Sequence, residues 1–355
     1  MSHAENIPGP VLCVSKSRAE RNIERMVAKC QRAGITLRPH FKTHQSLEVA
    51  GWFREQGVTR CTVSSPAMAR QFAAGGWGDI TIAFPAQPGA LEVYNELASE
   101  VHLALITDNE CVVRKLSDGL THEVSFWIEI DAGYGRTGVA WDDVDALTAL
   151  AHCVESSPNL ILKGVLTHAG DSYSCRGVDE ISACGERSMG ALASACEVVS
   201  DAVGRKLLTS YGDTPTCVVL DEFPNIDELR PGNFVFFDLT QYDIGSCSLD
   251  EIAVSVACPV VGIYPERNQV VVHGGAVHFS KDVLEDGSYG RVLIDRSMRS
   301  SAANIGLKSL SQEHGTIDGA GEWMNDLNVG DVLHILPVHS CLTADCFQGR
   351  YVCEA

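Results

Sequence analysis

The feature that most constrains the fold is an alternation of short apolar runs and longer amphipathic segments through the first two thirds of the chain. The apolar runs are nearly continuous, as in parallel strands that are buried on both faces. Segments with helical spacing separate them and are bounded by residues such as Gly34 and Pro66. We predict strands at 9–15, 35–41, 60–65, 79–85, 102–107, 124–131, 160–168 and 207–213. About eight repeats favour an α/β fold closed into a (β/α)8 barrel.

The pattern changes after about residue 245. Apolar runs typical of strands continue, whereas helical patterns almost vanish. The predicted β-rich runs are 251–277, 290–294, 331–337 and 350–354. We therefore predict two domains, a barrel at 10–245 and a β-rich domain at 246–355 that also takes residues 1–9.

Composition excludes several classes of partner. The formal net charge of −19 argues against nucleic acid and against an anionic membrane surface, both of which favour basic patches. No run of 18 apolar residues is present, so we expect no membrane span. The 14 cysteines form no CxxC pair and the first residues contain no apolar signal segment, which predicts reduced cysteines in a cytoplasmic protein.

Unusual polar residues fall just after the predicted barrel strands, where barrel enzymes carry their chemistry. They are Lys42, Arg136, His168 and the segment 212–214. Each has an ordinary structural alternative: a solvated lysine, an arginine paired with Asp131 or Glu129, a core histidine and a simple turn. Their shared location nevertheless predicts one site.

The residue types suggest covalent chemistry on an amine. A lysine near other cations and with limited water has a lowered pKa and can form a Schiff base, as pyridoxal phosphate requires. Backbone N–H groups and hydroxyls of "GDTPT" (212–216) suit a phosphate. Arg136 can only donate hydrogen bonds, so beside a pyridine nitrogen it would keep that nitrogen unprotonated.

Several segments resemble one family of enzymes. These segments are "LRPHFKTHQS" (37–46), "EIDAGYGRTGV" (129–139), "THAGDSYSC" (167–175), "GDTPT", "ELRPGNFVFFDLTQ" (228–241) and "VVHGGAVHFSKD" (271–282). They resemble motifs of the D-serine dehydratase and D-threonine aldolase family, which are pyridoxal-phosphate enzymes of the alanine-racemase fold. The resemblance implies a homodimer and Lys42 as the catalytic, Schiff-base lysine. It implies a cofactor site formed by Lys42, His40, Arg136, His168, Tyr173, Gly212, Asp213, Thr214 and Gln241.

Five positions depart from the family pattern. Asp213 stands where a serine is usual, and a carboxylate beside a phosphate is unfavourable, so we expect its side chain to point away. Phe234 and Phe237 replace tyrosines, His273 replaces an acidic residue, and Asp345 replaces an asparagine. These changes are compatible with a shifted substrate.

A metal motif is predicted near the end of the chain. His339 and Cys341 lie two residues apart in "PVHSCLTAD" (337–345), so on an extended segment they would face the same side. Imidazole and thiolate suit zinc, although on spacing alone an ordinary loop is the commoner explanation. The resemblance implies a His-x-Cys zinc site, with Mn²⁺ or another divalent cation as the alternative.

The predicted function is a zinc-assisted lyase that converts a D-β-hydroxy amino acid, D-serine first, to a keto acid and ammonia. One alternative is a D-threonine aldolase. Another is a D-3-hydroxyaspartate aldolase or dehydratase, for which Arg38 or His44 would supply an extra cation. An amino-acid racemase and a non-catalytic cofactor carrier are the remaining alternatives, but neither explains both the metal motif and the β-rich domain.

Overall fold

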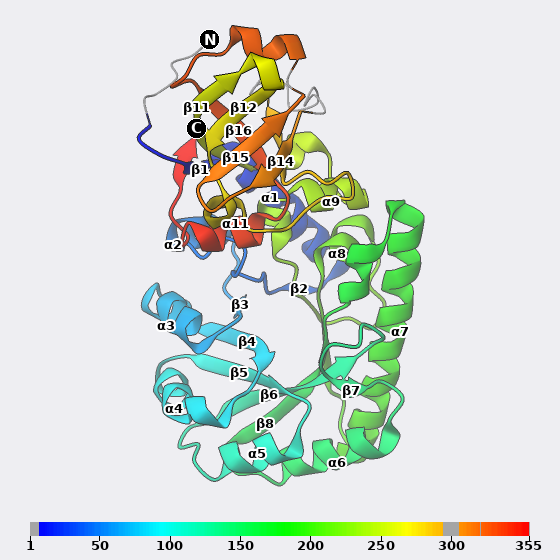
Figure 1. Ribbon diagram of the computed structural model, residues 1–355. Helices are drawn as coiled ribbons and strands as arrows, with labels where there is room; N and C mark the ends of the chain where they lie inside the picture. The colour runs from blue at the N-terminus through cyan, green and yellow to red at the C-terminus, as the bar shows by residue number, and fades with distance from the viewer. Residues whose placement is uncertain (1–6, 294–304, 320, 355) are drawn as a thin grey trace. The chain divides into compact units, whose positions relative to one another are not determined.

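The computed structural model describes residues 7–293, 305–319 and 321–354, which form two compact units (Figure 1). The barrel unit consists of Glu24–Lys42 and Leu47–Gly232. The β unit consists of the described residues within Met1–Ile23, Thr43–Ser46 and Asn233–Ala355. Among the described helices, none is both long enough and apolar enough to cross a membrane.

The barrel unit contains a parallel sheet that closes on itself. Within the described residues the hydrogen-bonded order is β2-β10-β9-β8-β6-β5-β4-β3, with β7 paired to β6. A parallel bridge between His40 and Thr62 joins the chain after β2 to β3 and completes the ring. The strands are β2 (Thr36–Leu37), β3 (Cys61–Val63), β4 (Asp79–Pro85), β5 (His102–Thr107), β6 (Val124–Asp131), β7 (Val139–Ala140), β8 (Leu160–Thr167), β9 (Leu208–Tyr211) and β10 (Glu228–Leu229). The predicted barrel is confirmed.

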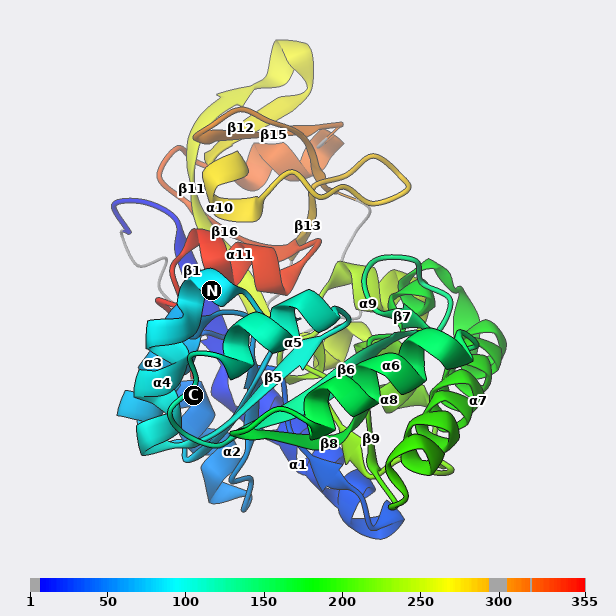
Figure 2. The same cartoon turned by 90° about the horizontal axis from the view of Figure 1, so that it is seen from below.

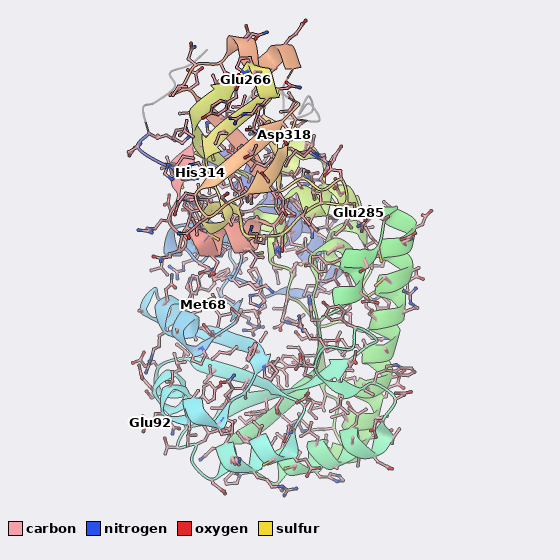
Figure 3. The ribbon with its side chains drawn as sticks, viewed as in Figure 1. Met68, Glu92, Glu266, Glu285, His314 and Asp318 are labelled. Carbon is pink, nitrogen blue, oxygen red and sulfur yellow. The ribbon has the colours of Figure 1, made fainter. Side chains whose placement is uncertain are left out.

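Helices cover the outside of this ring, as the view from below shows (Figure 2). They bury one apolar face each; α7, for example, buries Ile181, Leu192 and Val199. Charged residues such as Glu92 on α4 lie exposed at the outer edge of the unit (Figure 3). The helices are α1 (Lys16–Ala33), α2 (Leu47–Glu55), α3 (Pro66–Ala74), α4 (Leu91–Glu100), α5 (Glu110–Ser117), α6 (Val144–Glu155), α7 (Gly177–Val203) and α8 (Thr214–Val219).

The interior of the ring is packed with side chains rather than open. Ala104, Ile106, Trp127 and Leu166 form one buried cluster from β5, β6 and β8. Such a filled interior leaves the carboxyl ends of the strands and the loops after them as the surface where chemistry can take place.

The β unit has an eight-stranded sheet among its described residues. Its order is β13-β16-β11-β12-β15-β14, and β1 pairs with β11 on one side and β17 on the other. Figure 3 labels His314 and Asp318, the first and last residues of β15. The elements are β1 (Val11–Ser15), β11 (Val254–Tyr264), β12 (Gln269–His273), β13 (Gly290–Leu293), β14 (Leu307–Leu310), β15 (His314–Asp318), β16 (Val332–Pro337), β17 (Val352–Glu354), α9 (Leu239–Ile244), α10 (Ala276–Phe279) and α11 (Ser340–Cys346).

One strand of the predicted barrel is exchanged for another. The run 9–15 forms β1, which pairs with β11 and β17 instead of entering the barrel. Its place in the ring is taken by β10, which pairs with both β2 and β9. Because β1 is buried on both faces, its apolar sequence resembles that of a barrel strand. A strand of two residues such as β10 has no detectable periodicity.

The limits of the units also differ from the predicted 10–245 and 246–355 with 1–9. The β unit takes the chain as far as Ile23, the short segment Thr43–Ser46 and everything from Asn233. Within this unit, Thr43 and Asn233 both lie close to Cys341. A boundary drawn from strand and helix patterns does not register such side-chain contacts.

Candidate active site

Lys42 lies in the turn that follows β2 in the barrel unit. Its side chain is exposed, whereas the sequence predicts a site with limited water. The backbone N–H of Lys42 donates to His40 Nδ1 at 3.3 Å, so His40 holds the turn that presents the lysine. The amine is accessible to a carbonyl compound from solution.

His168 directly follows β8 and lies among the polar residues of this unit. Its Nδ1 lies 2.8 Å from the carbonyl oxygen of Gly212, which fits an Nδ1–H donor and leaves Nε2 as an acceptor. Burial, then the charges of Lys42 and Arg136, lower the pKa of His168 to about 3. His168 is therefore neutral near pH 7. The charges of Lys42 and Arg136 act on its pKa because both side chains lie near the ring.

The segment 212–214 leads directly into α8. Asp213 is buried and caps the helix: its carboxylate accepts from the Thr216 N–H at 2.7 Å, from the Thr216 hydroxyl, and from Ser172 Oγ at 3.0 Å. Its side chain thus points into the protein, as predicted. Burial raises the pKa of Asp213 to about 6, although these hydrogen bonds oppose the shift.

Tyr173 lies close to both Thr214 and His168. The Thr214 N–H lies 3.4 Å from the Tyr173 hydroxyl, and the Tyr173 ring centroid is 6.2 Å from that of His168. Gly212 is required by close packing, since a Cβ there would lie 2.9 Å from Cβ of Arg230. The structure therefore groups His168, Tyr173 and 212–214, as the sequence predicts.

Arg230 is a residue that sequence reasoning missed. It directly follows β10 and is buried, donating to the Ser210 hydroxyl and to the Thr167 carbonyl at 2.6 Å. Burial lowers its pKa to about 10, so it stays a cation near pH 7, and its charge also acts on His168. The only signal was its position inside the motif "ELRPGN".

Arg136 lies on an exposed loop after β6, with its guanidinium 5.5 Å from the ring centroid of Tyr134. The carboxylates considered as its partners serve the loop instead. Asp131 accepts from the backbone N–H groups of Gly133 and Gly135, and Glu129 accepts from Thr137 Oγ1 at 2.9 Å. A donor-only group on such a loop remains available for a ligand.

These groups fit a phosphorylated aldehyde. Lys42 offers an amine, Arg136 and Arg230 offer positive charge, and the segment 212–214 offers backbone donors. In the β unit, Gln241 is buried, its Oε1 accepts from Ser246 Oγ at 2.6 Å, and its Nε2 has no hydrogen-bond partner among the described residues. A buried amide with an unused donor suits a polar ligand, and the role of Gln241 stays a prediction.

The metal motif lies at the start of α11 in the β unit, and its predicted extended geometry is wrong. His339 is the N-cap residue of α11 and Cys341 is in the first turn. The two side chains still interact. Burial alone would lower the pKa of His339, but hydrogen bonds to Asp282 and Cys341 raise it to about 11.

Both side chains of the motif are held by neighbours. His339 Nδ1 lies 2.9 Å from Asp282 Oδ2, so Nε2 is the nitrogen that could bind a cation once it has lost its proton. Thr43 Oγ1 lies 3.2 Å and Asn233 Nδ2 3.7 Å from Cys341 Sγ. A carboxylate behind the imidazole and polar donors around the sulfur are what a metal-binding pair requires.

A buried carboxylate fixes the helix that carries this pair. Asp238 accepts from the Ser340 N–H at 2.8 Å and from Asn233 Nδ2 at 2.6 Å. Sequence reasoning missed the roles of Asp282, Asn233, Asp238 and Thr43. All four lie within the segments "LRPHFKTHQS", "VVHGGAVHFSKD" and "ELRPGNFVFFDLTQ", which resemble family motifs. The sequence did not show which residue of the metal motif each of them contacts.

The extra cation suggested for a second substrate carboxylate is not supplied by Arg38 or His44. Arg38 is fully buried, and its Nε and Nη1 lie 2.6 Å from Glu228 and Asp79 respectively. Burial lowers the pKa of His44 to about 3, so that residue is neutral. Neither residue therefore offers an exposed positive charge to a second carboxylate.

The other departures from the family pattern are accommodated locally. Phe234 and Phe237 are buried, where a phenyl ring needs no hydroxyl partner. His273 Nε2 lies 3.6 Å from Glu313 Oε2. Asp345 accepts from Gln45 Nε2 at 3.0 Å in an exposed position.

Comparisons with known proteins identify the family to which the chain belongs. Residues 14–240 match the family model described as "Alanine racemase, N-terminal domain", and residues 253–353 match the "Putative serine dehydratase domain". The chain is 33% identical to D-threo-3-hydroxyaspartate dehydratase of Delftia sp. strain HT23, over 96% of this chain and 92% of that protein. It is 28% identical to D-serine dehydratase of Dictyostelium discoideum, over 98% and 93%.

A solved structure extends this similarity to the fold. A cysteine-to-alanine mutant of D-threo-3-hydroxyaspartate dehydratase in the metal-free form matches with a TM-score of 0.93 and 30% identity, covering 100% of this chain and 96% of that one. The chain belongs to the D-serine dehydratase and D-threonine aldolase family of pyridoxal-phosphate-dependent lyases, with the alanine-racemase fold.

Proposed function

We propose that this protein removes water from a D-3-hydroxy amino acid to give a keto acid and ammonia. The observation that carries the proposal is the pair His339 and Cys341, with Asp282 behind the histidine and two polar groups at the sulfur. A thiolate and an imidazole favour a borderline-soft cation such as Zn²⁺. A cation placed for catalysis suits departure of a hydroxyl group better than racemisation, which needs no leaving-group assistance.

The residues of the barrel unit would hold the cofactor and move the α-proton. Pyridoxal phosphate, when bound, withdraws electrons from the α-carbon and so makes its proton removable. Lys42 would bind the cofactor covalently and, once displaced by substrate, accept that proton. Arg136 would donate to the pyridine nitrogen, while the N–H groups of 212–214 and the charge of Arg230 would bind the phosphate.

Neutral His168 has a separate part in this scheme. Because its Nδ1–H is engaged by the Gly212 carbonyl, its Nε2 can only accept a hydrogen bond. It would therefore orient a donor group of the bound molecules without adding a positive charge beside Lys42. A charged imidazole there would compete with the cations for the phosphate.

The residues of the β unit would assist the leaving group. A divalent cation, when bound, lowers the basicity of a departing hydroxyl. His339 and Cys341 would hold that ion, leaving coordination positions for substrate and water. Asp282 would keep the proton on Nδ1 of His339, so that Nε2 carries the lone pair.

The substrate we propose first is D-serine, because Arg38 and His44 do not supply the cation that a second carboxylate needs. D-threo-3-hydroxyaspartate is the second candidate, favoured by the 33% identity with a dehydratase of that name. We also propose a homodimer and a cytoplasmic location, in keeping with buried thiols such as Cys61, whose pKa is raised to about 12 by burial.

A substrate panel tests the proposal. Purified protein with pyridoxal phosphate and Zn²⁺ or Mn²⁺ is given D-serine, D-threo-3-hydroxyaspartate, D-threonine and their L-forms. Keto acid and ammonia from D-substrates alone are expected. Glycine plus an aldehyde would instead identify an aldolase, and interconversion of D- and L-forms would identify a racemase.

A further inference from the structure

Strand register places four polar side chains on one face of the β-unit sheet. Cys13 on β1 is the direct partner of Ser255 on β11. His334 on β16 pairs with Ala257, two residues from Ser255, so it shares that face. Glu354 on β17 follows Val352, the partner of Cys13, by two residues, so it shares the face as well.

Three of these side chains converge. A ligand atom from each of Cys13, His334 and Glu354 lies within 4.8 Å of the other two. Cys13 and His334 are buried and Glu354 is half-buried. Thiolate, imidazole and carboxylate are the ligand types of zinc sites, and they arrive from three different strands of a rigid sheet.

The charges of this group match a divalent cation. In the metal-bound form a thiolate and a carboxylate would carry two negative charges. A neutral imidazole adds none. One Zn²⁺ would balance both charges, with the Cys13 thiol losing its proton to solvent as the ion binds.

Ser255 supplies the support that a metal-bound histidine needs. His334 Nδ1 lies 3.2 Å from Ser255 Oγ. Metal-bound histidines usually donate their second ring N–H to an oxygen, which fixes the tautomer and directs the other nitrogen at the ion. Here Nδ1–H would donate to the serine and Nε2 would bind the cation.

A second cluster of possible metal ligands in the same unit, formed by His273, His278 and Glu313, lacks a supporting oxygen of this kind at His278. His273 and His278 direct Nε2 toward Glu313 at 3.6 and 4.0 Å. However, the Gly275 N–H donates to His278 Nδ1 at 3.2 Å and occupies the lone pair of that nitrogen. An ion on Nε2 would require a proton on the nitrogen that already accepts, so this cluster is better explained as a hydrogen-bonded group.

We propose that Cys13, His334 and Glu354 form a second metal site, which binds Zn²⁺ and ties β1 and β17 to the centre of the β-unit sheet. Water completes the tetrahedral coordination. The site is separate from His339 and Cys341, and it holds whether or not the proposed lyase activity is correct.

Cobalt spectroscopy tests this proposal in full-length protein. The double variant His339→Ala/Cys341→Ala removes the other metal motif, and chelated protein is then titrated with Co²⁺. We expect one ion per chain and a thiolate-to-cobalt charge-transfer band in the difference spectrum. Adding Cys13→Ser to this background should abolish the band, and adding Ser255→Ala should weaken Zn²⁺ affinity by about 10- to 100-fold.

Cys353→Ser in the same background is the matched control. Cys353 is next to Glu354 on β17 but pairs with Val14, so it faces the opposite side of the sheet, and its loss should leave the band unchanged. Absence of a thiolate band in the double variant would overturn the proposal, as would a band that survives Cys13→Ser. Cobalt bound without a thiolate band would point to the imidazole cluster and would also overturn it.

Discussion

The groups that would hold the cofactor and those that would hold the metal are organised in different ways. In the barrel unit, Lys42 and Arg136 are exposed on loops, whereas Asp213 and Arg230 are buried. In the β unit, His339 and Cys341 are both in hydrogen-bond contact with neighbouring side chains. The metal pair is thus fixed in advance by the protein, whereas the cofactor side chains retain rotamer freedom.

This difference has a chemical reason. A small cation offers no shape and must find its ligands already in place, since its affinity depends on ligand geometry and on the groups behind each ligand. A covalently attached cofactor is large and holds its own position once joined to a lysine. We therefore expect substitutions of the residues behind the metal ligands to reduce metal affinity strongly. In the barrel unit, we expect the strongest loss of activity when Lys42 itself is substituted.

The largest effect is expected from Lys42→Ala. Loss of the amine removes both the covalent link and the proton acceptor, so kcat should fall by at least about 10³-fold. Borohydride reduction followed by peptide mass spectrometry should find pyridoxyl-lysine at position 42 in the natural protein and none in the variant. Lys42→Arg keeps the charge and serves as the control; appreciable activity in it would contradict the covalent role.

Next comes Cys341→Ala, which removes the thiolate ligand. Metal content after gel filtration should fall by at least about 10-fold, and β-elimination should fall with it, because the hydroxyl then leaves unassisted. Cys346→Ala alters a second cysteine of the same helix and should change neither quantity. The metal assignment is wrong if elimination survives without bound metal.

Asp282→Asn tests the group behind the histidine. An amide oxygen can still accept from His339 Nδ1–H, but it lacks the charge that favours that tautomer. Metal affinity should fall by about 10- to 100-fold. The free energy of unfolding of metal-free protein should fall as well near pH 7, because the hydrogen bond to Asp282 raises the pKa of His339 in the folded state. Competition with a coloured chelator measures the affinity, and saturating metal should restore most of the activity.

Asp213 allows a test of the buried base through pH. Its pKa is raised to about 6 in the folded protein, so between about pH 4 and pH 6 the folded state holds more protons than the unfolded state. The carboxyl therefore contributes stability that declines as pH rises through this window, by about 2 kcal/mol for a shift of this size. Urea unfolding of the natural protein and of Asp213→Asn should show that difference between pH 4 and pH 6. Parallel pH profiles would show that this carboxyl titrates normally.

The sequence predicted the barrel because buried parallel strands and amphipathic helices leave a periodic record along the chain. It also predicted which residues group around His168, because the carboxyl ends of barrel strands meet. It failed where structure depends on pairing between distant segments: β1 and β10 exchanged roles, and Asp282 could not be assigned to His339. It failed again where local geometry overrode spacing, since the start of α11 bends the His339–Cys341 segment.

The smallest effect is expected from Asp345→Asn, which restores the residue usual in the family. Asp345 accepts a hydrogen bond from Gln45 Nε2 at 3.0 Å in an exposed position, and an amide oxygen accepts equally well. Exposed substitutions of this kind change stability by about 0.5 kcal/mol or less. Metal affinity should be unchanged, because Cys341 and His339 are held by Thr43, Asn233 and Asp282 rather than by Asp345. A change in metal affinity comparable to that of Asp282→Asn would mean that Asp345 does act on the metal ligands. The contacts that position His339 and Cys341 would then extend along α11 beyond its first turn.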